Sequence, residues 1–203
     1  MYNGCMQRKN ETLNYYESHA QEFSQGTQSL QFTEIQDLFL EKLSPNSFIL
    51  DLGCGSGRDA RYFLNRGYRV EAVDGSKEMC SIAQKLLGQP VKNVCFEEIE
   101  EHEKYDAIWA CASILHVPKV ELGGLFGKLN EALVSDGILY ASFKYSEFEG
   151  MRNGRYFTDF TCDSFSEFLK QIPGWQIEES WISRDVRPGR DEEKWLNLIL
   201  RKR

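Results

Sequence analysis

Short apolar runs alternate with helical patterns through most of the chain, and this alternation constrains the fold more than any other feature. The first apolar run, residues 48–51, is followed by Ala60, Phe63 and Leu64 at the i, i+3, i+4 spacing of a helix. Further apolar runs predict strands at residues 69–73, 91–96, 106–112, 138–143, 175–182 and 195–200. Because helical patterns connect the first strands, these strands should be parallel and flanked by helices.

The helices expected between these strands have recognisable ends. Ser76 caps one helix, a leucine-rich stripe predicts another that ends near Gly137, and Ser164 with Glu167 forms a capping-box signature before a third. No helical pattern separates the last two strands, so residues 183–194 should form a long hairpin loop between antiparallel neighbours. The predicted fold class is α/β, a doubly wound seven-stranded, mostly parallel sheet with helices on both faces and an antiparallel last strand.

The chain length predicts a single domain. At 203 residues it can bury one sizeable core, and we expect an N-terminal helical cap over residues 1–45 and a core over residues 46–203. The cap contains a polar stretch with Gly and Gln at residues 21–31. We therefore expect residues 1–30 to be a mobile lid that excludes water when it closes.

Charge and composition disfavour several classes of partner. The formal net charge of −7 opposes non-specific attraction to nucleic acid or to an anionic membrane. No apolar run approaches the length that spans a bilayer, and no apolar segment follows Arg8 and Lys9 as in a signal peptide.

Cysteine usage favours a reduced, cytoplasmic protein. No two cysteines form a C-x-x-C pair and none lies in a cluster with zinc-like spacing, so we expect no metal site. The six cysteines are Cys5, Cys54, Cys80, Cys95, Cys111 and Cys162.

A glycine-rich loop follows the first predicted strand, at the edge where open α/β sheets bind ligands. Residues 51–57 read D-L-G-C-G-S-G, and their three glycines allow a tight turn with close approach of a ligand to the backbone. The dinucleotide fingerprint G-x-G-x-x-G would place its third glycine where Arg58 stands, and no G-K-[ST] follows as in a phosphate-binding loop. The spacing therefore disfavours a nicotinamide dehydrogenase.

Acidic residues lie at the ends of three successive predicted strands. Asp51 directly precedes the glycines and suits a cationic group better than a pyrophosphate. Asp74 ends the second strand, where a carboxylate can accept both hydroxyls of a ribose. Glu97 follows the third strand, although it also begins an acidic run, residues 97–103, that reads equally as solvated charge. Together the three carboxylates predict a pocket for an adenosine that carries positive charge.

Residues 49–57, I-L-D-L-G-C-G-S-G, closely resemble the first motif of class I S-adenosylmethionine-dependent methyltransferases. Residues 70–74 and 105–110 resemble the second-strand and fourth-strand motifs of that family, and residues 133–139 resemble its passage into the fifth strand. The specific resemblance covers residues 47–143. The compact architecture is similar to that of the small-molecule methyltransferases, including the family named after tellurite resistance.

The resemblance implies a Rossmann-like domain whose cofactor is S-adenosyl-L-methionine. The glycine loop and the acid before it would face the methionine part, the second-strand acid would hold the ribose, and the residues near the third strand would meet the adenine, where the family often has Asp in place of Glu. The implied cofactor contacts are Asp51, Gly53, Cys54, Gly55, Asp74, Gly75, Met79, Glu97 and Ala112.

Methyl transfer from a sulfonium is an in-line displacement that mainly requires alignment and exclusion of water. A general base is needed only when the acceptor arrives protonated. The candidates for catalysis are His116, after the fourth strand, and Tyr15 and Tyr16 in the cap, at positions where relatives often carry such residues. His116 reads equally as a ring held by backbone at a helix end, and the tyrosines as anchors that pack the cap.

Basic residues concentrate on two loops, one after the fifth strand and one in the final hairpin. Tyr145, Arg155 and Arg187 are the candidate acceptor contacts, because a guanidinium holds a carboxylate or phosphate through two parallel hydrogen bonds. These arginines could equally be loop charges paired with neighbouring acidic residues.

The sequence therefore favours an S-adenosylmethionine-dependent methyltransferase that acts on a small molecule, with an anionic acceptor as one alternative. An RNA- or protein-modifying methyltransferase that docks through the arginine loops is a second interpretation. A non-catalytic regulator that binds the same cofactor is a third. The absence of an Asn-Pro-Pro-Tyr-type motif argues against amino methylation of DNA bases.

Overall fold

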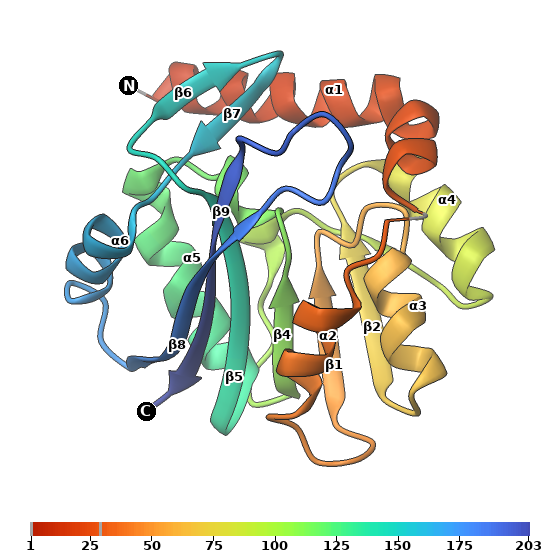
Figure 1. Ribbon diagram of the computed structural model, residues 1–203, viewed down its shortest axis with the longest axis vertical. Helices are drawn as coiled ribbons and strands as arrows, with labels where there is room; N and C mark the ends of the chain where they lie inside the picture. The colour runs from red at the N-terminus through yellow and green to blue at the C-terminus, as the bar shows by residue number, and fades with distance from the viewer. Residues whose placement is uncertain (1, 29) are drawn as a thin grey trace.

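The computed structural model describes residues 2–28 and 30–203. A seven-stranded sheet lies at its centre, in the order β3-β2-β1-β4-β5-β9-β8 (Figure 1). The neighbouring pairs from β3 to β5 are parallel, and β9 is antiparallel to both β5 and β8. The doubly wound sheet with an antiparallel last strand is therefore confirmed. Its strands are β1 (Phe48–Leu52), β2 (Arg69–Asp74), β3 (Lys92–Asn93), β4 (Tyr105–Ala110), β5 (Leu133–Lys144), β8 (Trp175–Arg184) and β9 (Lys194–Lys202).

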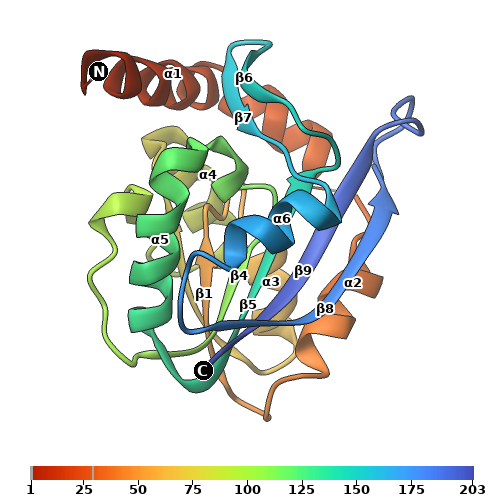
Figure 2. The same ribbon diagram turned by 90° about the vertical axis from the view of Figure 1, so that its left-hand side faces the viewer.

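Helices cover both faces of the sheet. On one face, α2 (Thr33–Leu40), α3 (Arg58–Asn65) and α4 (Lys77–Leu87) pack into one core cluster. On the other face, α5 (Lys119–Ala132) and α6 (Cys162–Leu169) pack into a second cluster. Figure 2 shows this layering, with α5 on one side of the sheet and α2 on the other. Among the residues described, no helix is long and apolar enough to cross a membrane.

A roof lies across the carboxyl ends of the parallel strands (Figure 1). It consists of α1 (Tyr2–Thr27), the separate hairpin of β6 (Glu149–Arg152) and β7 (Arg155–Thr158), and the loop that joins β8 to β9. The helical cap predicted for the N-terminus is present, mostly as the 26-residue α1. Whether α1 moves as a lid stays a prediction.

The strands divide the core between the two faces because successive side chains alternate. Ile108 of β4 belongs to the α5–α6 side, and Trp109 belongs to the α2–α3 side. The fully buried Trp109 ring stacks on Tyr140 of β5, with ring centroids 4.0 Å apart. Its indole N–H donates to Asp59 Oδ2 at 2.8 Å. This contact joins the centre of the sheet to the first turn of α3.

Two predicted boundaries are corrected. β3 covers only Lys92–Asn93, and the chain then turns into a short 3₁₀ helix, η1 (Phe96–Glu98), because the Glu98 carboxylate accepts from the Cys95 N–H at 2.7 Å. The helix expected to end near Gly137 ends at Ala132 instead, and β5 begins at once. A Cβ at Gly137 would lie 2.9 Å from the Val134 carbonyl oxygen, so this tight passage requires glycine.

The region after β5 also differs from expectation. The β6–β7 hairpin was expected to be loop, although its turn residues Asn153 and Gly154 both have positive φ, 51° and 76°. An Asn-Gly pair is the strongest short-range signal for such a hairpin. The cap of α6 is Thr161 and not Ser164, since Thr161 Oγ1 accepts from the Ser164 N–H and Ser164 Oγ accepts from the Thr161 N–H.

We expect Trp109→Phe to lower the free energy of unfolding by roughly 2–4 kcal/mol. The change removes a donor from a buried carboxylate and leaves a smaller ring against Tyr140. Urea unfolding followed by circular dichroism measures the loss. Trp181→Phe, at a partly exposed position beside Tyr140, is the control and should lose clearly less. Equal losses would show that the contact with Asp59 contributes nothing.

Candidate active site

A cavity of about 900 Å³ lies between the sheet and the roof. It has two connected parts that differ in their walls. We call the part beside the loop after β1 the glycine-loop half, with Gly53, Cys54, Gly55, Asp74, Gly75, Met79 and Phe96 in its wall. We call the part beneath the β6–β7 hairpin the hairpin half, with Tyr16, His116, Lys144, Tyr145, Arg155, Phe157, Asp159 and Trp195 in its wall.

The loop after β1 has a conformation that requires glycine. Gly53, Gly55 and Gly57 have φ values of 75°, 54° and 85°. A Cβ at Gly53 would lie 2.5 Å from the Ser113 Cβ, so no side chain fits there. The N–H groups of Gly53 and Cys54 both donate to the Val73 carbonyl at 2.9 Å. These bonds fix the loop against β2.

Asp74 at the end of β2 is the polar centre of the glycine-loop half. Its Oδ2 accepts from the Gly55 N–H and its Oδ1 from the Ser76 N–H, both at 2.9 Å. Each oxygen therefore keeps a lone pair, which is what two neighbouring hydroxyl donors need. Burial raises the pKa of Asp74, and the two N–H groups oppose that effect. A Cβ on the adjacent Gly75 would lie 2.7 Å from a Leu13 methyl, so this glycine admits the approach of α1.

The contact predicted between Asp51 and the cofactor stays a prediction. The Asp51 side chain is buried beneath the loop, outside the cavity wall, and Oδ2 accepts from the Ala60 N–H at 3.1 Å. Asp59, in the first turn of α3, lies in the wall instead. Burial and the nearby Asp59 raise the pKa of Asp51. Burial also acts to raise the pKa of Asp59, but the Arg58 guanidinium and the hydrogen bonds from Trp109 and Gln36 together lower it. An acidic residue in the first turn of a helix is the signal that could have identified Asp59.

The contact predicted between Glu97 and the adenine stays a prediction. Glu97 lies in η1, beyond the end of β3, and its exposed side chain reaches the cavity wall from there. Its carbonyl oxygen accepts from Lys128 Nζ at 2.6 Å. Phe96, which sequence reasoning missed, lies in the same wall as the buried Met79. Met79 lies at the start of α4, and its contact with the adenine stays a prediction.

Ala112 marks the boundary between the two halves. Its φ of 49° is rare for a residue with a side chain, and its N–H donates to Ser142 Oγ at 2.8 Å. Ser113 follows directly and lies in the cavity wall. Its Oγ is buried and has no hydrogen-bond partner.

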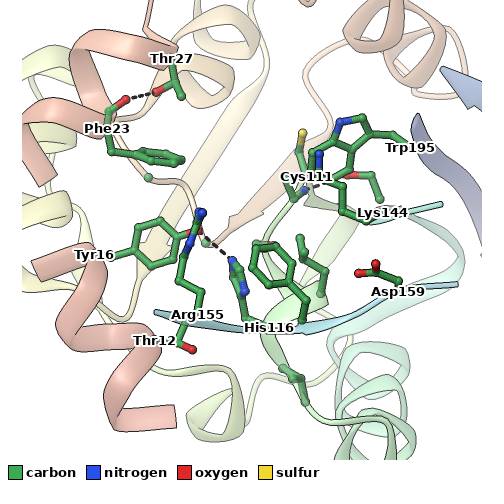
Figure 3. A pocket seen from close by; sticks show the side chains of 18 of the residues that line it. Thr12, Tyr16, Phe23, Thr27, Cys111, His116, Lys144, Arg155, Asp159 and Trp195 are labelled. Carbon is green, nitrogen blue, oxygen red and sulfur yellow. Dashed lines mark hydrogen bonds between the residues drawn. The ribbon is translucent and has the colours of Figure 1, made fainter. Parts of the chain in front are cut away.

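His116 and Tyr16 meet in the hairpin half (Figure 3). His116 Nδ1 lies 2.6 Å from the Tyr156 carbonyl, which only accepts, so we assign the ring proton to Nδ1. His116 Nε2 then accepts from the Tyr16 hydroxyl at 2.8 Å, and Arg155 Nη1 donates to the same hydroxyl at 3.3 Å. Loss of hydration lowers the pKa of His116 to about 4. Burial raises the pKa of Tyr16, and Arg155 opposes that effect.

The two candidate tyrosines have different positions. Tyr15 lies outside the cavity wall, where its ring stacks on His19 with centroids 4.3 Å apart. The Arg155 guanidinium lies 4.5 Å from the centroid of the same ring. Because consecutive helical residues point about 100° apart, only Tyr16 faces the cavity. The structure therefore distinguishes Tyr16, which faces the cavity, from Tyr15, which does not; the sequence did not distinguish them.

The predicted acceptor contacts also divide. Arg187 Nε donates to Asp185 Oδ1 at 2.8 Å, and Arg187 Nη2 pairs with Asp185 Oδ2, so both arms of its guanidinium are engaged. For Arg187 the structure therefore shows a paired loop charge. Arg155 has no ion pair among the described residues and packs between the rings of Tyr15, Tyr16 and Phe157. Tyr145 lies in the wall, at the end of β5.

Five of the six cysteines are described by the structure. Cys54, Cys80, Cys95, Cys111 and Cys162 are free. Burial raises the pKa of Cys111, which lies in the cavity wall, so its thiol stays protonated. The side chain of Cys5 lies outside the described part.

Known proteins match the central part of this chain in sequence. Residues 49–137 match the family described as Methyltransferase domain. Malonyl-[acyl-carrier protein] O-methyltransferase of Acetivibrio thermocellus is 33% identical over 106 residues, which are 49% of this chain and 37% of that protein. The chain spans less than half the length of the curated relatives it matches.

Solved structures share the fold over almost the whole chain. The 1,6-didemethyltoxoflavin-N1-methyltransferase of Burkholderia thailandensis has a TM-score of 0.76 at 21% identity, covering 99% of this chain and 88% of that one. TehB of Haemophilus influenzae has a TM-score of 0.70 at 17% identity, covering 89% and 66%. The chain is therefore similar to methyltransferases in the sequence of residues 49–137 and in its fold, and the Burkholderia structure was solved with S-adenosylhomocysteine bound.

The pKa of His116 predicts a specific loss of stability in acid. Its folded-state pKa of about 4 lies below the ordinary value of 6.5, so the unfolded chain binds the proton first as the pH falls. The stabilisation is present above about pH 6.5 and is lost toward pH 4. Between pH 7 and pH 5 the wild type should lose about 2 kcal/mol more than His116→Gln in urea unfolding. Asp51 and Asp74 act oppositely in both proteins and cancel in the difference. Parallel curves would contradict a neutral, buried His116.

Proposed function

We propose that this protein transfers a methyl group from S-adenosyl-L-methionine to a small molecule that enters the hairpin half of the cavity. One observation carries the proposal. The glycine-loop half and the hairpin half form a single cavity, and the chain's own roof covers it. A covered space suits a small acceptor better than a polymer, and the net charge of −7 opposes a phosphate backbone. The bound ligands named for the Burkholderia enzyme, 1,6-didemethyltoxoflavin and S-adenosylhomocysteine, support the same division.

The glycine-loop half contains side chains and backbone groups that suit this cofactor. Asp74 would hold the ribose hydroxyls through its two free lone pairs, and Met79 and Phe96 would pack against the adenine. The loop backbone at Gly53–Gly55 and the region of Ala112 would face the methionine part. Bound S-adenosyl-L-methionine supplies a methyl group on a positively charged sulfur. The residues around it align the acceptor and exclude water.

Tyr16 and His116 would remove a proton from an acceptor that arrives protonated. Tyr16 takes that proton on its oxygen as its own proton passes to His116 Nε2, which is free to accept it. Arg155, 3.3 Å from the tyrosine oxygen, favours the transient negative charge there. The Tyr156 carbonyl, which already accepts from Nδ1, stabilises the imidazolium that results.

We expect Asp74→Ala to weaken binding of S-adenosylhomocysteine by roughly 2–4 kcal/mol, because charged hydrogen bonds to the ribose disappear. Isothermal titration calorimetry measures the change. Asp106→Ala is the matched control. Asp106 lies at the amino end of β4, away from the carboxyl ends of the parallel strands, and its carboxylate accepts from the Phe48 N–H. Equal affinity of wild type and Asp74→Ala would remove Asp74 from the site. Tighter binding of NAD than of S-adenosylmethionine would overturn the proposed function.

The acceptor is found by assaying release of S-adenosylhomocysteine over a panel of metabolites, beside total tRNA and a protein extract. Turnover with a metabolite supports the proposal. Turnover with tRNA or protein alone would favour a macromolecule-modifying enzyme, in which the arginine loops dock the substrate. Tight cofactor binding without turnover on any class would favour a non-catalytic regulator.

With an acceptor in hand, Tyr16→Phe and His116→Gln should each lower kcat by roughly 10²-fold or more while cofactor affinity stays unchanged, because each variant interrupts proton removal. Because the pKa of His116 is about 4, wild-type kcat should persist well below pH 6.5. Tyr15→Phe distinguishes the two tyrosines, since Tyr15 lies outside the wall. Full activity of both Tyr16→Phe and His116→Gln would mean that no base is used.

A further inference from the structure

The strand β7 presents alternate side chains to the hairpin half. Arg155, Phe157 and Asp159 lie in the cavity wall, whereas Tyr156 and Thr158 between them do not. This is the two-residue period of an extended strand, in which side chains i, i+2 and i+4 share one face. The strand rise places about 13 Å between the first and last of the three. β7 and the residue that directly follows it therefore line the hairpin half with a cation, an aromatic ring and a carboxylate in order.

One carboxylate oxygen of Asp159 has no hydrogen-bond partner. The Asp159 side chain is 1% exposed, and Oδ2 accepts from Ser146 Oγ at 2.7 Å and from Arg152 Nη2 at 2.8 Å. Its Oδ1 is buried and has no partner. A buried carboxylate oxygen without a donor is strongly unfavourable, so a donor from a ligand would be favoured there. Figure 3 shows the carboxylate extending from its strand toward the cavity.

Other buried atoms without a hydrogen-bond partner belong to residues of the same cavity wall. Among the described residues, only three buried side-chain N or O atoms have no hydrogen-bond partner, namely Ser113 Oγ, Arg155 Nε and Asp159 Oδ1. All three residues line the cavity. The other buried side-chain N and O atoms of the described residues have partners, so the unmet side-chain hydrogen-bonding capacity lies where ligands would bind.

The charges around Asp159 restrict the kind of donor. Arg152 already neutralises the carboxylate through the 2.8 Å ion pair, and Lys144 in the same wall is paired with Asp185 and Glu193. Arg155 adds a positive charge with no ion pair among the described residues. The neutralised carboxylate therefore gives a cationic group little net attraction, whereas a neutral N–H can still donate to its free oxygen. The Phe157 and Trp195 rings provide flat apolar surfaces for a planar molecule.

We propose that Asp159 selects the methyl acceptor, accepting at Oδ1 a hydrogen bond from a neutral ring N–H of a planar heterocycle that lies against Phe157. Its reacting atom would lie toward Tyr16 and His116, at the other end of the strand's inward face. The inference rests on the proposed function and specifies its substrate class. It differs from the anionic acceptor that the arginines alone suggest, because Arg152 and Arg187 are already paired.

The variant Asp159→Asn tests this point sharply. Ser146 and Arg152 both donate to the Oδ2 position, so the new side chain should place its carbonyl oxygen there and its NH₂ at the Oδ1 position. The substitution thereby turns the orphaned acceptor into a donor while keeping the shape. Thr158→Val is the matched control, because Thr158 directly precedes Asp159, is buried, donates to the Val117 carbonyl and is not part of the cavity wall.

The probes are 2-quinolone, which has a ring N–H, and N-methyl-2-quinolone, which has none, with 2-naphthoate as the anionic comparison. Calorimetry on protein saturated with S-adenosylhomocysteine should show at least ten-fold tighter binding of 2-quinolone than of its N-methyl analogue. Asp159→Asn should abolish or reverse that preference, and Thr158→Val should keep it. If Asp159→Asn fails to fold, the double variant Asp159→Leu, Arg152→Leu removes the ion pair as a unit and should likewise abolish it.

Equal binding of the two quinolones by wild type would overturn the inference, and is the result expected if a water molecule satisfies Oδ1. Strongest binding of 2-naphthoate, or no binding of any probe, would also overturn it. Failure of S-adenosylhomocysteine to bind would instead overturn the proposed function. Cofactor binding without a donor preference leaves the proposed function standing and removes only the role of Asp159.

Discussion

The site depends on the hydrogen bonds that tie the glycine loop to the end of β2. The Val73 carbonyl accepts from two successive loop N–H groups, and the Asp74 carboxylate accepts from a third, at Gly55. These bonds are possible because β1 and β2 are adjacent parallel strands whose carboxyl ends lie together. They hold the loop open toward the cavity and place the start of α3 behind it, where Asp51 and Asp59 fix the helix. Without this arrangement the sheet would have a turn here but no pocket.

The roof connects the two halves of the cavity through α1. Thr12 Oγ1 accepts from the Tyr156 N–H of the hairpin, and a turn later Glu17 accepts from Ser76 Oγ at the start of α4. Tyr16, between these anchors, reaches His116. A single helix therefore contacts the hairpin on one side and the end of β2 on the other. Displacement of α1 would open both halves at once, so cofactor and acceptor would share one closing element.

Local sequence signals predicted the sheet and the glycine-loop half well. Strand and helix periodicity, the glycine spacing and the acid at the end of β2 each act within a few residues, and they fix the fold class, the loop and the place of Asp74. Boundaries were less accurate where tertiary contacts override propensity, as at β3 and at the end of α5. The β6–β7 hairpin was missed although its Asn153–Gly154 turn signals it.

By itself, then, the sequence determined a doubly wound α/β sheet with a glycine loop beside Asp74, because these features arise from neighbouring residues. Only the tertiary structure decided which charges and rings meet. His116 forms a hydrogen bond with Tyr16, which lies one hundred positions away in the sequence. Arg187 forms an ion pair with Asp185, whereas Arg155 forms no ion pair among the described residues. The physical reason is that the partner of a side chain depends on how distant segments pack together. The sequence around two arginines does not show which of them will lie beside a carboxylate. The unpaired oxygen of Asp159 is visible only when every nearby donor has been placed.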